Sequence, residues 1–211
     1  MIKQIVRNVR GVKNSFKEFF VRRNFKKCAT LIGTGHKFYS SAGILLSWGS
    51  TKEDVVLHDH CEIYGGLISI NKGKIIIHDW VKVGFDCSIT SVNHIEIGKD
   101  TAIASGVTII DNNTHPICPA DRRYMRHTPH GSSERSNHHS ANAPIIIGEN
   151  VWIGSNVRIC KGVTIGDNAI IAANSIVTKN VPANAIAAGN PAKIVKENID
   201  QTTTPIFPLK K

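Results

Sequence analysis

A six-residue repeat of aliphatic residues constrains the fold of this chain more than any other feature of its sequence. Between Pro144 and Val181, a strict interval of six separates the residues Ile147, Ile153, Ile159, Ile165, Ile171 and Val177. Neither the 3.6-residue period of a helix nor the two-residue alternation of a single strand produces this interval. A hexapeptide period is typical of a parallel β-helix, in which three short strands joined by turns form one triangular coil.

The repeat also predicts which residues stack on one another. Three sixes make one coil, so each aliphatic residue should lie against the one 18 residues away. The expected pairs are Ile147–Ile165, Ile153–Ile171 and Ile159–Val177. Gly, Asn and Asp occupy the corner positions, where the backbone turns tightly and adopts left-handed conformations.

Less regular copies of the repeat come earlier in the chain. They comprise Leu57 and Ile63, then Ile77, Val83 and Ile89, and, after a slip of two residues, Ile97, Ile103 and Ile109. Residues 28–54 show no clean period, so we expect the first coil near Val55. The pattern stops at Asp111 and returns at Ile145. The segment 111–144 is therefore a long loop, and such loops are usually functional or disordered.

The run VWIGSNVRICKGVTIGDNAIIAANSIVTKNVPANAIAAGNPAKIVKE resembles the left-handed β-helix (hexapeptide-repeat) acyltransferases. The subgroup that it resembles contains the maltose, galactoside and polysaccharide O-acetyltransferases, and the resemblance covers residues 75–197. It implies an all-β fold, a left-handed parallel β-helix. The left-handed coiling comes from the family alone, because general chirality rules favour right-handed crossovers.

The resemblance further implies an O-acetyltransferase that uses acetyl-CoA as co-substrate and a saccharide as acceptor. A surface-polysaccharide or lipopolysaccharide precursor is the expected acceptor class. In the family, a long loop leaves the β-helix at this point and reaches the active site of the adjacent subunit. We therefore expect a homotrimer, in which each active site has walls from two chains.

Acyl transfer from a thioester to a hydroxyl needs a base, an oxyanion donor and two substrates held together. Histidine is the commonest base, because its pKa lies near neutrality. The resemblance implies that His115, in NTHPI, is the catalytic base. It also implies that Asp86 binds the acceptor hydroxyls and that Trp152 forms a wall of the acceptor pocket. The alternatives are a loop histidine held by the backbone, a corner Asp that caps a turn, and a Trp at the trimer contact.

Acetyl-CoA has a thin pantetheine arm, which can lie on a β-helix face only where side chains are small. Ser155, Ala172 and Ala173 meet this condition. The positions that meet the nucleotide end in the family are matched here by Thr178, Lys179, Lys193 and Lys196. Two of these are often Arg in relatives, and lysine pairs with phosphate as a point charge without the bidentate fork. The alternative for the lysines is ordinary solvated charge.

The formal net charge of +10 is concentrated in residues 1–27, which hold nine Lys or Arg and one acidic residue, Glu18. The rest of the chain is nearly neutral, which argues against a nucleic-acid-binding body. The same segment has an apolar stripe at helical spacing, made of Ile2, Ile5, Val6, Val9, Val12, Phe16, Phe19 and Phe20. This basic amphipathic helix either packs on the β-helix or a neighbouring subunit, or lies on an anionic membrane near a lipid-linked acceptor.

We divide the chain into the basic amphipathic helix (1–27), a β-helix acyltransferase domain (28–197) with an extended active-site loop (111–144), and a C-terminal extension (198–211). The extension has no assignable role. We recognise no signal peptide and no apolar run of the ~20 residues that a membrane span needs. The odd number of cysteines, five, without a CxxC pair predicts reduced thiols in a cytoplasmic protein, peripheral to the membrane if residues 1–27 bind lipid.

Two other functions compete with acetyl transfer. A zinc enzyme of the γ-carbonic-anhydrase type shares the β-helix but needs histidine ligands five residues apart. The residues at that distance from His115 are Ile110 and Ala120, so no metal is expected there. The loop histidines His127, His130, His138 and His139 could bind a metal, although a solvated loop explains them too. A non-catalytic scaffold is the second rival, and the set of His115, Trp152 and Lys179 favours an enzyme.

Overall fold

Short strands from successive turns of the chain line up in three sheets, which we call A, B and C. The structure, a computed structural model, describes residues 16–202 and 204. Sheet A contains β1 (Thr30–Leu31), β4 (Val55–Leu57), β7 (Lys74–Ile77), β10 (His94–Ile97), β13 (Ile145–Ile147) and β16 (Thr164–Ile165). Sheet B contains β2 (Lys37–Phe38), β5 (Glu62–Ile63), β8 (Lys82–Val83), β11 (Ala102–Ile103), β14 (Trp152–Ile153), β17 (Ile170–Ile171), β19 (Ile186–Gly189) and β20 (Ala192–Lys196). Sheet C contains β3 (Gly43–Ser47), β6 (Gly66–Ile70), β9 (Ser88–Ser91), β12 (Thr108–Ile110), β15 (Arg158–Ile159) and β18 (Ile176–Val177).

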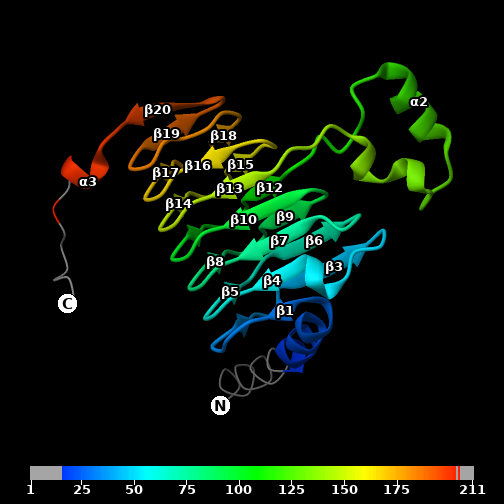
Figure 1. Cartoon of the computed structure of the whole chain (residues 1–211), viewed down its shortest axis with the longest axis horizontal. Helices are drawn as coiled ribbons and strands as arrows, with labels where there is room; N and C mark the ends of the chain where they lie inside the picture. The colour runs from blue at the N-terminus through cyan, green and yellow to red at the C-terminus, as the bar shows by residue number, and fades with distance from the viewer. Residues whose placement is uncertain (1–15, 203, 205–211) are drawn as a thin grey trace, which may run out of the picture.

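From β1 to β18 the strands follow one another in the order A, B, C, so that each of these coils contributes one strand to every sheet (Figure 1). Neighbouring strands are parallel, except in the terminal hairpin of β19 and β20. The three predicted stacking pairs are confirmed as register partners: Ile147–Ile165, Ile153–Ile171 and Ile159–Val177. Three parallel sheets in this repeating pattern are consistent with the left-handed β-helix that the family resemblance implies.

The core is the column of aliphatic side chains inside the coils. Each two-residue strand directs one side chain outward and the next inward, as in β14, where Trp152 is exposed and Ile153 is fully buried. Cys61 and Cys87 take inward positions, and burial raises the pKa of the Cys61 thiol to about 12. The inward residue of one coil contacts that of the next, so burial is continuous along the stack.

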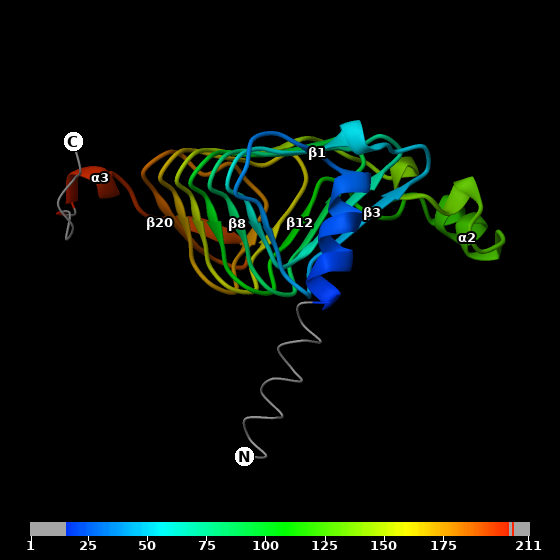
Figure 2. The same ribbon diagram turned by 90° about the horizontal axis from the view of Figure 1, so that it is seen from below.

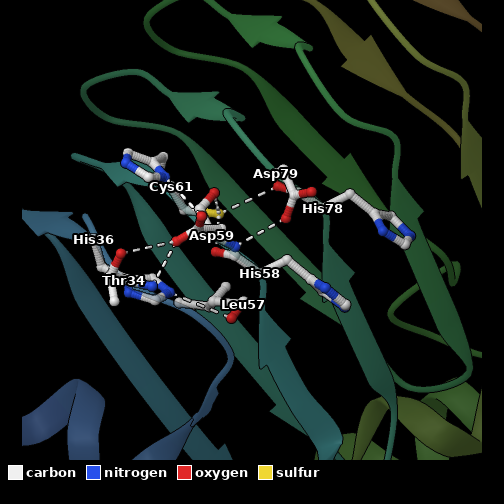
Figure 3. A network of polar contacts seen from close by, with 9 residues as sticks. Thr34, His36, Leu57, His58, Asp59, Cys61, His78 and Asp79 are labelled. Atoms are coloured by element: carbon white, nitrogen blue, oxygen red, sulfur yellow. Dashed lines mark hydrogen bonds and ion pairs between the residues drawn. The ribbon is translucent and has the colours of Figure 1, made fainter.

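The corners hold residues that tolerate left-handed backbone, as predicted. Asn156, Asn168 and Asn174 all have φ near +60° (58°, 59° and 61°). At the corner between sheets A and B, which we call the A–B edge, carboxylates also tie one coil to the next. The Asp59 N–H donates to Asp79 Oδ1 at 3.0 Å, and Asp59 in turn accepts from the backbone N–H of Thr34 (Figure 3). The Glu149 N–H repeats this bond to Asp167 Oδ1 at 2.8 Å.

The coils begin earlier than the sequence predicts. The segment 28–54, expected to precede the repeat, already contributes β1, β2 and β3, which pair in parallel with β4, β5 and β6. The connection from β3 to β4 includes a 3₁₀ turn, Lys52–Asp54, and the extra residues hide the period. Coils before the loop also contain more than three sixes, since Leu57 pairs with Ile77 and Ile77 with Ile97. This longer spacing explains the predicted two-residue slip.

Three segments lie outside the coils. The predicted basic helix (1–27) falls partly outside the described residues, and residues 16–28 are helical at the N-terminal end of the stack (Figures 1 and 2). The segment between β12 and β13 projects from the side of the stack and contains the helix α2 (Pro119–His127) and two 3₁₀ turns, Ser133–Arg135 and Asn137–His139. The short helix α3 (Ile199–Thr202) follows β20. No helix within the described ranges has the length and apolarity that a membrane crossing requires.

Candidate functional site

The base of the loop is a closed, hydrogen-bonded stem at the corner between sheets C and A, which we call the C–A edge. The outgoing residues 111–113 pair with the returning residues 141–143, through bonds from Ala143 N–H to the Asp111 carbonyl and from Asn113 N–H to the Ala141 carbonyl, both 3.0 Å. Asn112 and Asn142 form a β-bridge between them. The loop therefore leaves the stack from a defined position.

The Asp111 side chain anchors this stem to the coil below. Its carboxylate is fully buried and accepts hydrogen bonds from the Ser91 hydroxyl (2.7 Å) and from the backbone N–H groups of Val92 (3.0 Å) and Asn93 (2.9 Å). A buried carboxylate is tolerated when its oxygens are paired in this way. In the sequence, Asp111 marks only the end of the repeat, because its hydrogen-bond partners come from another coil.

His115 lies two residues beyond the stem, in a tight turn whose hydrogen bonds define its tautomer. The Thr114 hydroxyl donates to the Asn113 carbonyl at 2.6 Å, and the same oxygen lies 3.1 Å from His115 Nδ1. Because the single hydroxyl proton is used in the bond to Asn113, we assign Nδ1 as the donor to Thr114 Oγ1. The neutral imidazole then carries its proton on Nδ1 and presents the lone pair of Nε2, on an exposed side chain.

Thr114 holds this turn in an unusual conformation. Its φ is +62°, in the left-handed region that β-branched residues rarely adopt. Its N–H donates to Asn112 Oδ1 at 2.8 Å, which stabilises the turn from the stem side. Strained backbone that is held by its surroundings is often found at functional sites. The strain at Thr114 is consistent with a functional role for the adjacent His115.

A surface track runs from the His115 turn along the C–A edge toward the C-terminal end of the stack. A hollow of about 350 Å³ beside the stem is lined by Ile110, Asn112, Asn113, Arg158, Cys160, Lys161 and Thr178. Thr178 also lines a second hollow, of about 300 Å³, with Lys179 and Lys193. The structure thus brings these three predicted cofactor residues together, whereas Lys196 does not line either hollow. Arg158 and Lys161 were missed because outward basic residues have no sequence signal of their own.

The other predicted residues lie at the corner between sheets B and C, the B–C edge. Asp86 is an exposed corner residue with φ +54°, and Ser155, Ala172 and Ala173 occupy the corners of later coils at the same edge. A Cβ on Gly154 would lie 2.6 Å from the Ala173 backbone nitrogen, so glycine is what allows these corners to stack so closely. In these later coils, the corners of the B–C edge therefore stack closely and carry small side chains.

Two aromatic residues flank this edge. Trp152 is 57% exposed on sheet B, between the register partners Ala102 and Ile170. Phe85, next to Asp86, is 50% exposed, and its ring centroid lies 4.4 Å from that of Tyr64. Sequence reasoning missed Phe85, although a large aromatic at a corner where later coils have Ser105 and Ser155 was a usable signal. Exposed aromatic rings beside a carboxylate suit the apolar face and hydroxyls of a sugar.

Within one chain, the two groups of residues do not meet. His115, Thr178 and Lys179 follow strands of sheet C, at the C–A edge, whereas Asp86 and Ser155 precede strands of the same sheet, at the B–C edge. The width of sheet C separates the base candidate from the acceptor candidates.

Comparisons with known proteins identify the family. The family described as "Bacterial transferase hexapeptide (six repeats)" matches residues 144–179. WbbJ of Escherichia coli (strain K12), whose assigned role is O-acetyl transfer in lipopolysaccharide biosynthesis, is 35% identical over 136 residues, which cover 64% of this chain and 67% of the relative. The chain belongs to the hexapeptide-repeat acetyltransferase family. The resemblance and the acyltransferase class that the sequence predicts are those of this family.

This hexapeptide-repeat acetyltransferase is also similar to a second O-acetyltransferase in sequence and to a third in structure. The polysialic acid O-acetyltransferase of Escherichia coli O1:K1 is 42% identical over 147 residues, covering 69% of this chain but only 43% of that protein's length. The crystal structure of a maltose O-acetyltransferase from Clostridium difficile 630 superimposes with a TM-score of 0.51 and 26% identity, covering 82% of this chain and 72% of that one.

In this hexapeptide-repeat acetyltransferase, the polar network at the A–B edge and two of the loop histidines are held by hydrogen bonds within the chain. The network in Figure 3 joins backbone groups of successive coils at the A–B edge, so its carboxylates are used for folding. In the loop, His138 Nδ1 bonds to Ser136 Oγ at 2.8 Å and His139 Nε2 to the Ser133 carbonyl at 3.0 Å. Burial and the nearby His139 lower the pKa of His138. Across residues 16–202 and 204, no three His, Cys, Asp or Glu side chains are grouped so that they could hold a metal ion.

Proposed function

We propose that this chain is an O-acetyltransferase that transfers the acetyl group of acetyl-CoA to a saccharide hydroxyl, with His115 as general base. The observation that carries the proposal is the hydrogen-bonded turn at the loop base, which leaves His115 Nε2 as a proton acceptor. The relatives named for polysialic acid, lipopolysaccharide and maltose acetylation support a saccharide acceptor, and a surface-polysaccharide or lipopolysaccharide precursor is the class that we favour.

The proposed reaction follows from this geometry. Nε2 takes the proton of the sugar hydroxyl as the sugar oxygen attacks the thioester carbonyl carbon. The tetrahedral intermediate then collapses, the carbon–sulfur bond breaks, and the proton passes from His115 to the departing CoA sulfur. Thr114 Oγ1 accepts from Nδ1–H throughout, so it keeps the ring oriented and stabilises the imidazolium that forms transiently.

We propose that acetyl-CoA lies along the track at the C–A edge, with its thioester at His115 and its nucleotide end at Lys179 and Lys193. The small residues Ser155, Ala172 and Ala173, with Asp86 and Trp152, would then form the opposite wall from the B–C edge of a neighbouring chain. This arrangement places the site in the seam between two subunits of a homotrimer built from left-handed β-helices. The proposal rests on the separation of the two edges in one chain.

The proposed function is tested by incubating the protein with acetyl-CoA and a panel of saccharides, including hexoses, maltose and sialic acid polymers. Release of CoA thiol that depends on one of these acceptors, with acetate found on a sugar hydroxyl by mass spectrometry, supports the proposal. Stable acetyl-CoA with every acceptor, in a protein that still binds acetyl-CoA, would favour the scaffold alternative.

The shared site predicts that two inactive variants rescue each other. His115→Asn removes the base at the C–A edge, and Trp152→Ala removes a wall of the B–C side. In oligomers assembled from an equal mixture, about a quarter of the seams carry neither change, so activity should rise well above that of either variant alone. Light scattering should report a trimer for both variants. Mixed oligomers that are no more active than the parents would place the whole site in one chain.

The two lysines should act on cofactor binding rather than on chemistry. Lys179→Ala and Lys193→Ala should each raise the acetyl-CoA KM by about three- to tenfold with little change in kcat, because phosphate contacts far from the reacting carbon stabilise ground and transition states alike. Lys196→Ala, on the same strand as Lys193 but outside the hollow, is the matched comparison and should have a smaller effect. A large loss of kcat at unchanged KM would show that the nucleotide end lies elsewhere.

A further inference from the structure

The helix formed by residues 16–28 has two different apolar faces, and one of them packs on the first coil of the described structure. Val21 and Phe25 face the coils: Phe25 is fully buried and stacks on Phe38, with ring centroids 4.2 Å apart, and Val21 packs against the same core. Residues spaced by four lie on one side of a helix, so this face docks the helix on the first coil.

The opposite face carries three phenylalanines that remain largely exposed in the described structure, although Phe19 also lines a hollow beside the first coil with Arg22 and Phe38. Phe16, Phe19 and Phe20 are 68%, 61% and 51% exposed, and they contact each other edge to face at 5.2 and 5.7 Å. These residues belong to the predicted apolar stripe, and in the structure these three side chains stay largely exposed and do not join the core of the chain's own β-helix. The stripe's earlier members, from Ile2 to Val12, lie outside the described residues.

Basic residues continue the same exposed face. Arg23 and Lys27 follow Phe16 and Phe20 at helical spacing, and both are exposed, as are Lys17, Arg22 and Lys26. Glu18 is the one acidic residue in this helical segment. We call the surface formed by Phe16, Phe19, Phe20, Arg23 and Lys27 the aromatic–basic face.

We infer that the aromatic–basic face binds the surface of an anionic lipid bilayer. Aromatic side chains insert at the boundary between headgroups and acyl chains, and lysine and arginine beside them attract acidic lipid headgroups. The first turn would supply the aromatic anchors, while the next two turns supply the charge.

Charge complementarity favours lipid over a second copy of this chain. A symmetric contact through this face would bring two strongly basic surfaces together, and like charges at an interface oppose association. The remainder of the sequence is nearly neutral, so its composition offers no acidic excess to match the helix. The inference does not use His115 or acetyl transfer, and it can hold if the proposed activity fails.

The experiment is co-sedimentation of the full-length chain with vesicles, without any acyl donor. Vesicles of phosphatidylcholine with about a quarter phosphatidylglycerol should bind the protein, and pure phosphatidylcholine vesicles should bind it at least tenfold less. Raising the salt from about 0.1 M to 0.5 M should weaken binding severalfold, because it screens the headgroup attraction.

Two variants test the two parts of the face separately. Replacing Phe16, Phe19 and Phe20 together by serine should lower the vesicle partition coefficient at least tenfold. Arg23→Glu with Lys27→Glu should lower it by about fivefold or more for each charge, on acidic vesicles only. All five side chains are exposed, so circular dichroism should show both variants folded.

The matched control is Leu45→Ser with Lys72→Glu, which removes an exposed apolar and an exposed basic residue elsewhere and should leave vesicle binding unchanged. Absence of binding to acidic vesicles, or binding that both variants retain in full, would overturn the inference. So would a change of oligomeric state in the serine variant, seen by light scattering, because the face would then be a subunit interface.

Discussion

Replacing His115 by asparagine is expected to lower kcat by about 10²–10⁴-fold, the usual contribution of a general base. Asparagine keeps polarity and approximate size but cannot accept the proton of the sugar hydroxyl. Acetyl-CoA binding, measured by calorimetry, should persist, because the hollow around Thr178, Lys179 and Lys193 does not contain His115. The limb of the pH–rate profile that reports deprotonation of the base should disappear in the variant.

Thr114 provides a graded control for this prediction. Thr114→Ser keeps the hydroxyl that accepts from His115 Nδ1 and should retain most of the activity, whereas Thr114→Ala should lower kcat by roughly fivefold or more, the value of one hydrogen bond of about 1 kcal/mol. If His115→Asn retained a large share of wild-type kcat on a competent acceptor, the base would lie elsewhere. The next candidates would be His127, His130, His138 and His139.

Removing the Asp111 carboxylate is expected to loosen the base of the loop. In Asp111→Ala, the Val92 and Asn93 N–H groups and the Ser91 hydroxyl lose their acceptor, and each buried donor left unpaired costs about 1–3 kcal/mol. We expect a loss of roughly 2–4 kcal/mol in the free energy of unfolding. Asp111→Asn should recover little of it, because the amide has only one acceptor oxygen for several donors.

Amide hydrogen exchange can measure this loosening of the loop base residue by residue. The amides of Val92 and Asn93 should exchange much faster in Asp111→Ala, while amides in the coils distant from the stem stay protected. The kcat should fall by about 10- to 100-fold, because displacement of a base by even ~1 Å is costly. Asp100→Asn, a change at an exposed corner that tolerates left-handed backbone, is the matched control. Unchanged exchange at Val92 and Asn93 would show that Asp111 does not anchor the stem.

The coil architecture was predictable because its rule is local. An inward position recurs every six residues, so Ile147, Ile153 and Ile159 identify their stacking partners by sequence spacing alone, and all three pairs are confirmed. The same dependence on local spacing explains why the sequence did not predict the first coil, in residues 28–54. There the 3₁₀ turn at Lys52–Asp54 and a longer first coil break the count, although the strands still pair. Helix α2 could not be predicted from periodicity either. Met125 is its one buried residue, and a single buried residue makes no apolar stripe.

The amphipathic N-terminal segment shows what periodicity cannot decide. Helical spacing identified the stripe that includes Phe16 and Phe20 but not its partner, and the structure buries Phe25 instead. A stripe says that a helix has an apolar side. Which side of the helix packs on the β-helix depends on the shape of the open end of the first coil, where the ring of Phe25 stacks on that of Phe38.

For this protein, the sequence by itself determined the repeating coil, the family and the point at which the loop leaves the stack. Tertiary structure alone decided which edge each candidate residue occupies and how Asp111 anchors the stem. The physical reason is that coil stacking brings together residues that are tens of positions apart, such as Asp111 and Ser91. Local spacing predicts that a residue faces outward, whereas only the folded stack shows which other outward residues lie beside it.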